Sequence, residues 1–267
     1  MFGPYGYAGV QTMNDSQPQN PSVMILVKNE SYFLPYVLKQ CEGIFDSYVI
    51  YDIDSTDNTR EIIEWFHERN KDKADFTVRY MPDLPKEVQG AFRNSMIVEG
   101  QRPIYWILDG DELYSREDLL HIKKCSEDLK IAHAFDNTKR FGVFKRVELN
   151  PELTMQYSRR RSHHRIYHNS AYWTGNHPGE VSGYKQEEAS EEWYEILCWH
   201  FHNAERSPNE AEVLKRMERK KKKTYHPGEL EPVNILKELP ILRTRIEQFP
   251  VSPALEALWL KRELSGP

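Results

Sequence analysis

Two aspartates, Asp109 and Asp111, follow a short apolar run and are separated only by Gly110. A turn of the chain at the glycine would let both carboxylates approach one ion. Hard oxygen ligands of this kind suit Mg²⁺ or Mn²⁺ and leave positions open for phosphate oxygens. An acidic turn after a buried strand would use the same residues, so the surrounding elements have to decide between a metal site and a solvated turn.

A second acidic cluster, Asp52, Asp54 and Asp57, also follows an apolar run. Strand patterns alternate with helix patterns through this part of the chain: strands over 23–27, 47–51, 77–81 and 104–108, and helices over 32–41, 59–69 and 88–100. Such alternation predicts a mainly parallel α/β sheet. Ligands of these sheets bind beyond the carboxyl ends of the strands, where both clusters are expected, which favours a functional site.

Composition sets the frame. The 267 residues are enough for one large α/β domain with an appendage, and no apolar run approaches the roughly 18 residues of a membrane span. The net charge of −5 gives no overall attraction to nucleic acid or anionic membranes. Residues 1–21 are expected to form a flexible tail without a secretory signal. Cys41, Cys125 and Cys198 form no C-x-x-C pair, so we expect a reducing, cytoplasmic setting.

Four short motifs stand in a fixed order in the first half of the chain. They are V-K-N-E at 27–30, D-I-D-S-T-D-N-T at 52–59, R-N at 93–94 and D-G-D-E at 109–112. Together they resemble the nucleotide-sugar-binding half of family 2 glycosyltransferases with the GT-A fold, over residues 22–115. The resemblance implies a GT-A catalytic domain over 22–205, with an acceptor half at 116–205, and a helical C-terminal appendage at 206–267.

The resemblance also implies an activity. Such an enzyme moves a sugar from a nucleoside-diphosphate sugar to an acceptor hydroxyl, usually with inversion, and uses Mn²⁺ or Mg²⁺ bound by Asp109 and Asp111. The ion neutralises charge on the departing diphosphate. The residues that the resemblance places at the donor are Val27, Asn29, Glu30, Asp52, Asp54, Asp57, Arg93 and Asp109.

The second half is less regular. Strand patterns at 141–147 and 164–167 precede W-T-G-N-H-P-G-E at 173–180, which is similar to a W-x-G-x-x-H-E element at the acceptor side of several family 2 enzymes. Pro178 and Gly179 depart from that element. A base must take the proton of the acceptor hydroxyl, and either Glu180 or His177 could do so. A polar turn is the structural alternative.

The run W-H-F-H ends at His202. On a strand, His200 and His202 would face the same side, and an imidazole is a common metal ligand beside carboxylates. The resemblance to an H-x-x-x-x-S-x-x-E element places the metal ligand at His202, with His200 as the alternative. Two half-buried strand histidines are the structural reading.

The acceptor is open: a saccharide, a lipid-linked sugar, a protein side chain or a hydroxylated base in nucleic acid would each fit. Two basic runs, 159–161 and 220–223, are solvated faces unless they hold phosphates.

Two other classes of protein would also be compatible with these residues. A metal-dependent nucleotidyltransferase or phosphotransferase also uses paired carboxylates, but the sequence has no G-x-x-x-x-G-K-[ST] loop. A non-catalytic nucleotide-sugar or nucleic-acid binding module would bind without turnover.

Overall fold

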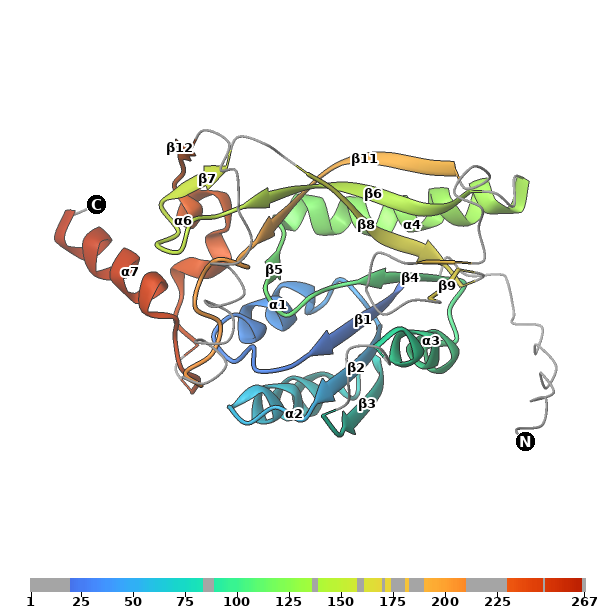
Figure 1. Ribbon diagram of the computed structural model, residues 1–267, viewed down its shortest axis with the longest axis horizontal. Helices are drawn as coiled ribbons and strands as arrows, with labels where there is room; N and C mark the ends of the chain where they lie inside the picture. The colour runs from blue at the N-terminus through green and yellow to red at the C-terminus, as the bar shows by residue number, and fades with distance from the viewer. Residues whose placement is uncertain are drawn as a thin grey trace.

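The computed structural model describes residues 20–83, 89–135, 139–157, 161–169, 171–173, 181–182, 190–209, 230–246 and 248–265. An eight-stranded sheet in the order β3-β2-β1-β4-β8-β6-β11-β5 forms its centre (Figure 1). The strands are β1 (Ser22–Val27), β2 (Ser47–Ile53), β3 (Asp75–Met81), β4 (Ile104–Ile107), β5 (Glu112–Leu113), β6 (Lys139–Glu148), β8 (Arg161–His168) and β11 (Ser190–His200).

The first half of the chain forms the parallel part of this sheet. Strands β1, β2, β3 and β4 all run in one direction, joined through α1 (Leu34–Cys41), α2 (Thr59–Asn70) and α3 (Gln89–Gly100). The mainly parallel α/β sheet expected from the sequence is therefore confirmed. In the second half, β8 pairs antiparallel with both β4 and β6, and β5 pairs antiparallel with β11.

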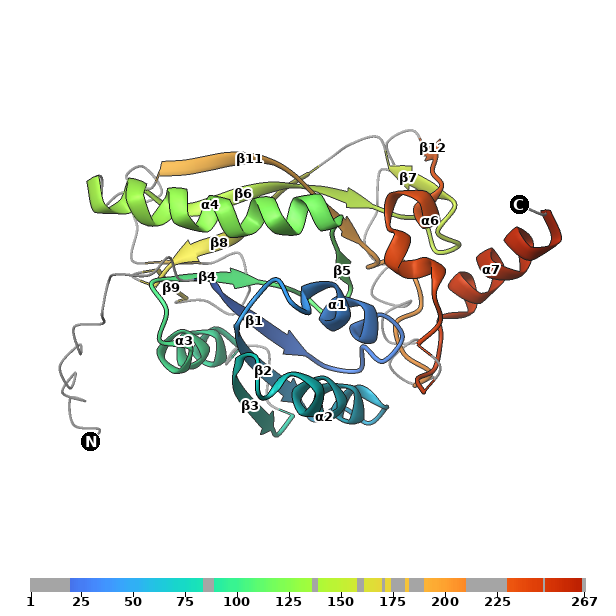
Figure 2. The same ribbon diagram turned by 180° about the vertical axis from the view of Figure 1, so that it is seen from behind.

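Strands β1, β2 and β4 bury both faces, as their nearly continuous apolar sequences require, whereas the edge strand β3 stays partly exposed. Alternate residues of β1 point to opposite sides: Ile25 joins a large core, and Met24 a smaller one. Helices α1, α2 and α4 (Arg116–Phe135) contribute to the large core and lie in front of the strands in Figure 2. Helix α3 covers the other face through Phe92 and Met96.

The C-terminal segment packs against the large core. It contains the short helices α6 (Ile235–Glu238) and η2 (Pro240–Arg243) and the longer α7 (Pro253–Ser265). Strand β12 (Leu230–Pro232) pairs with β7 (Met155–Tyr157), and β9 (Tyr172–Trp173) pairs with β10 (Val181–Ser182). Leu239, Leu242 and Phe249 are buried beside residues of α1 and α2. Among the described residues, no helix has the length and apolar character needed to span a bilayer.

Candidate functional site

The D-G-D turn lies directly after β4, beside the carboxyl end of β1. The backbone turns so that the Glu112 N–H donates to the Asp109 carbonyl, 3.2 Å away. A Cβ atom at Gly110 would lie only 2.8 Å from Glu30 Cγ and from Val27 Cγ1. Because real Cβ atoms do not approach other atoms so closely, this spacing requires glycine. The glycine thus brings the acidic turn against the K-N-E segment.

Asp111, His200 and His202 form a cluster that could hold a metal ion. One ligand atom from each residue lies within 4.8 Å of the other two. The two imidazole rings are stacked, with centroids 5.2 Å apart and planes at 11°. Strand β11 ends at His200, so His202 lies in a turn and not on the strand as expected, yet the rings still lie together. The Phe201 N–H donates to the Asp111 carbonyl at 2.9 Å, which fixes this turn against the acidic one.

The electrostatics of the cluster fit a cation. Burial lowers the pKa of His200 to about 3, against the attraction of Asp111, so the imidazole is neutral at pH 7. A neutral imidazole is the form that binds metals. Burial disfavours the charged form of Asp111, but the Arg206 guanidinium, followed by His200, outweighs it and lowers the pKa of this carboxyl. One carboxylate and two imidazoles suit a transition ion such as Mn²⁺ better than Mg²⁺, which prefers oxygen ligands.

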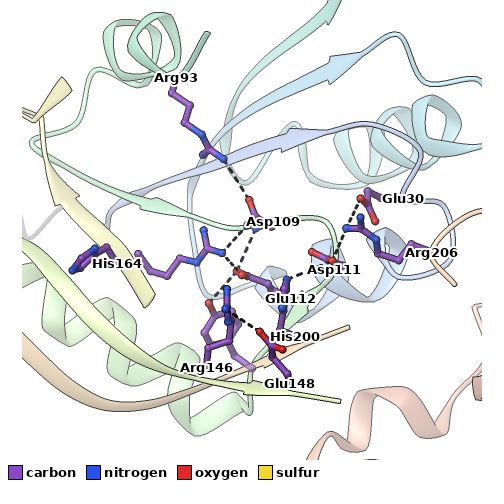
Figure 3. A network of polar contacts seen from close by, with 12 residues as sticks. Glu30, Arg93, Asp109, Asp111, Glu112, Arg146, Glu148, His164, His200 and Arg206 are labelled. Atoms are coloured by element: carbon purple, nitrogen blue, oxygen red, sulfur yellow. Dashed lines mark hydrogen bonds and ion pairs between the residues drawn. The ribbon is translucent and has the colours of Figure 1, made fainter. Parts of the chain in front are cut away.

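Asp109 lies outside this cluster and is bound by two arginines instead. Arg165 Nη2 donates to Asp109 Oδ2 at 2.7 Å. Arg93 points to the same carboxylate (Figure 3), with its Nη2 atom 3.5 Å from Asp109 Oδ1. The same Arg165 nitrogen also binds Glu112, which is fully buried. The Asp109 side chain is 31% exposed, so it faces the solvent side of the site.

Arg206 completes the polar network. Its Nη1 atom lies 2.5 Å from Asp111 Oδ2 and 2.8 Å from Glu30 Oε1, and Figure 3 shows the guanidinium between the two carboxylates. Sequence reasoning gave no role to Arg165 and noted Arg206 only as part of a motif. An arginine within a strand pattern or a loop looks like an ordinary exposed residue, and only the fold shows that Arg165 is buried and that most of the Arg206 side chain is covered.

The K-N-E and S-T-D-x-T motifs bind each other through hydrogen bonds. Asn29, at a positive φ of 53°, accepts from the Thr56 N–H at 2.8 Å, and its own N–H donates to Ser55 Oγ at 2.9 Å. The Glu30 N–H donates to Thr59 Oγ1 at 2.9 Å. Asp57 accepts from the Thr59 N–H at 2.9 Å and from the Ser207 hydroxyl at 2.6 Å. These motifs therefore shape the ends of β1 and β2.

Asp52 lies at the end of β2, level with Val27 of β1, and is fully buried. Its Oδ1 atom accepts from the Ser55 hydroxyl. Among the described residues its Oδ2 atom accepts no hydrogen bond, and Arg60 is 3.8 Å away. Burial raises the pKa of this carboxyl, although Ser55 and Arg60 oppose the shift. An incompletely paired buried carboxylate is a ready acceptor for a ligand N–H or hydroxyl. Asp54, by contrast, is exposed.

The remaining candidates fall elsewhere. Glu180 and His177, the expected bases, lie outside the described residues, as do the 220–223 run and residues 159–160 of the 159–161 run.

No family model matches the chain, and no curated protein matches it. Several solved structures resemble it. S. aureus TarS 1–349 in complex with UDP is 19% identical over 58% of this chain, with a TM-score of 0.36, and this chain spans half the length of that one. The mannosyltransferase PcManGT from Pyrobaculum calidifontis, in complex with GDP-Man and Mn²⁺, is 12% identical over 94% of this chain and 77% of its own, with a TM-score of 0.45.

A third similar structure is a Bacillus anthracis protein whose name assigns it to the glucose-1-phosphate thymidylyltransferases. It is 12% identical over 73% of this chain and 95% of its own, with a TM-score of 0.40. The structures that resemble this chain thus include both nucleotide-sugar glycosyltransferases and nucleotidyltransferases. With TM-scores below 0.5, these similarities concern general architecture, and none of them assigns a residue of this chain.

Proposed function

We propose that this protein is a metal-dependent glycosyltransferase that moves a sugar from a nucleoside-diphosphate sugar to an acceptor hydroxyl. The observation that carries the proposal is the cluster of Asp111, His200 and His202 at the carboxyl edge of the sheet, next to a turn whose acids are bound by arginines. A metal site surrounded by guanidinium groups is suited to a diphosphate, because both the ion and the arginines bind phosphate oxygens.

The two ends of the donor fit different parts of the site. Asp52 has a buried oxygen ready to accept from a base or ribose. It lies near the end of β2, and only β1 stands between β2 and β4, the strand that leads into the acidic turn. Asp109, on the solvent side, can accept from a ribose or sugar hydroxyl or contact the ion through water. Arg93 is placed to contact the diphosphate once donor binds.

The reaction needs charge neutralisation and a proton acceptor. The ion, when bound, stabilises the negative charge that develops on the departing diphosphate. Asp111, His200 and His202 would hold the ion, and Arg93 and Arg165 orient Asp109. Glu180 or His177 takes the proton of the acceptor hydroxyl in a single in-line displacement with inversion. This assignment follows from the motif resemblance alone.

Product analysis tests the proposal. The protein is incubated with Mn²⁺ and a panel of nucleoside-diphosphate sugars, with water able to replace the unidentified acceptor, and the released nucleotide is separated by chromatography. We expect one donor to release nucleoside diphosphate and free sugar. Release of pyrophosphate from a nucleoside triphosphate and a sugar phosphate would indicate a nucleotidyltransferase, and binding without any release would indicate a binding module.

A further inference from the structure

Arg206 and a metal ion bound at the proposed site would compete for the same carboxylate oxygen of Asp111. The Arg206 Nη1 atom contacts Asp111 Oδ2, and this same oxygen is 3.6 Å from His200 Nε2. An ion held between Asp111 and His200 would therefore face the guanidinium across one carboxylate oxygen. Two cations on the same oxygen repel each other strongly in a buried site.

The arginines around the acidic turn differ in how firmly they are held. Arg165 is on β8 with a side chain only 3% exposed, and Arg93 is on α3 at 6%. Arg206 lies outside any helix or strand, and its side chain is 13% exposed. Of these three, Arg206 is the one that can leave its carboxylates with the smallest change in the fold.

The guanidinium also has unused hydrogen-bonding capacity. A single nitrogen, Nη1, binds both Glu30 and Asp111, while the buried Nε has no hydrogen-bond partner among the described residues. A buried donor without a partner is costly, and a phosphate oxygen would satisfy it. The diphosphate of a donor would thus give Arg206 a more complete set of contacts than Glu30 and Asp111 alone provide.

We propose that Arg206 is a cation latch: the Arg206 guanidinium neutralises Asp111 and Glu30 until a metal ion takes its place on Asp111. The displaced guanidinium then binds a diphosphate. This inference rests on the proposed function, because the diphosphate is the donor's. It implies that ion and diphosphate bind cooperatively, since each removes a cost that the other would face. Without a diphosphate, Arg206 weakens ion binding. An arginine that only supports the fold would not weaken the binding of the ion.

The test is the dissociation constant of Mn²⁺, measured without nucleotide from the paramagnetic resonance signal of the free ion. We expect Arg206→Gln to bind Mn²⁺ more tightly than the wild type, by roughly 5- to 150-fold, the usual range of coupling between sites. Arg93→Gln is the matched control: it removes one buried positive charge beside Asp109 and leaves Asp111 untouched, so its effect should be smaller.

Unchanged or weaker Mn²⁺ binding by Arg206→Gln, or an equal gain in Arg93→Gln, would overturn the latch. If Arg206→Gln does not fold, Arg206→Met decides, because it also removes the positive charge and keeps a long unbranched side chain at this position. A tighter Mn²⁺ constant than wild type supports the latch, and an equal or weaker one rejects it.

A second measurement adds a nucleoside diphosphate, with UDP and GDP as probes. The nucleotide should tighten Mn²⁺ binding of the wild type by a larger factor than that of the variant, and equal factors would reject the coupling. The first measurement contains no nucleotide. A protein that binds Mn²⁺ as described but processes no nucleotide sugar would therefore refute the proposed function and leave the competition standing.

Discussion

In the proposed metal site, the choice of ion depends on the side chains of Asp111, His200 and His202. Because His200 and His202 would provide nitrogen ligands beside Asp111 in the proposed site, we expect Mn²⁺ to support donor binding at least about tenfold more effectively than Mg²⁺. His200→Ala and His202→Ala should each weaken Mn²⁺ binding by about 10- to 100-fold or more. Calorimetric titration of the ion measures both effects, with the exposed His164→Ala as control. Equal use of Mg²⁺ and Mn²⁺ would contradict a ligand set with two histidines.

The ionised Asp52 carboxylate is expected to lower the stability of the fold while it contributes to donor binding. Its pKa is raised by burial, so the folded state holds the proton more tightly than the unfolded state, and the carboxyl contributes least to stability when it is ionised. Asp52→Asn should therefore increase the free energy of unfolding at pH 7, on the order of 1 kcal/mol, the usual scale of single substitutions. That gain should shrink as the pH falls through the raised pKa towards the ordinary value.

Urea unfolding at pH 7 and pH 4 measures this difference. The same variant should bind the donor more weakly, with a lost charge-assisted hydrogen bond corresponding to about 1.5–3 kcal/mol. A variant that is less stable than the wild type at pH 7, or whose gain increases towards pH 4, would show that Asp52 has a structural role.

Between elements, the site depends on close contact of three segments: the end of β1, the acidic turn and the 201–209 segment. Gly110→Ala should force the turn away from Glu30 and Val27, since overpacking of this kind costs about 1–3 kcal/mol. Mn²⁺ affinity should fall with it. Thermal unfolding and metal titration report the two effects. Gly43→Asn is the control, because no atom lies within 4 Å of a Cβ there and asparagine tolerates its φ of +73°. Wild-type behaviour of Gly110→Ala would mean that the turn is not held by this contact.

The 201–209 segment is attached to the first half of the chain by Ser207, whose hydroxyl donates to Asp57. Ser207→Ala should reduce stability by about 1–3 kcal/mol, because a half-buried charged acceptor loses a buried donor. Ser31→Ala is a matched control: Ser31 is equally buried, and its hydroxyl makes no hydrogen bond among the described residues. Chemical denaturation compares the two, and equal losses would show that the attachment has no specific effect.

The sequence predicts the elements whose pattern lies within a short stretch of neighbouring residues. Strands β1, β2 and β4 and helix α2 were predicted within two residues of their observed ends, because apolar periodicity and polar ends are local. The D-x-D pair and the two histidines were found from residue type and spacing. The partners of β8 and β11, and the burial of Arg165 and Arg206, depend on contacts between distant segments, which leave no local pattern.

For the molecule as a whole, an α/β sheet places a cluster that could hold a metal ion, an acidic turn bound by arginines and a buried carboxylate along one edge. The proposed function requires that this edge bind a nucleoside-diphosphate sugar through an ion on Asp111. Thermal unfolding of the wild type and Asp111→Asn, across a panel of these sugars with Mn²⁺ or EDTA, tests it most directly, because a ligand that binds the folded state raises the melting temperature. At least one sugar should stabilise the wild type with Mn²⁺, and should have little effect in EDTA or on a folded Asp111→Asn. Stabilisation that is equal in EDTA, or equal in Asp111→Asn, or absent with every sugar, would contradict the account.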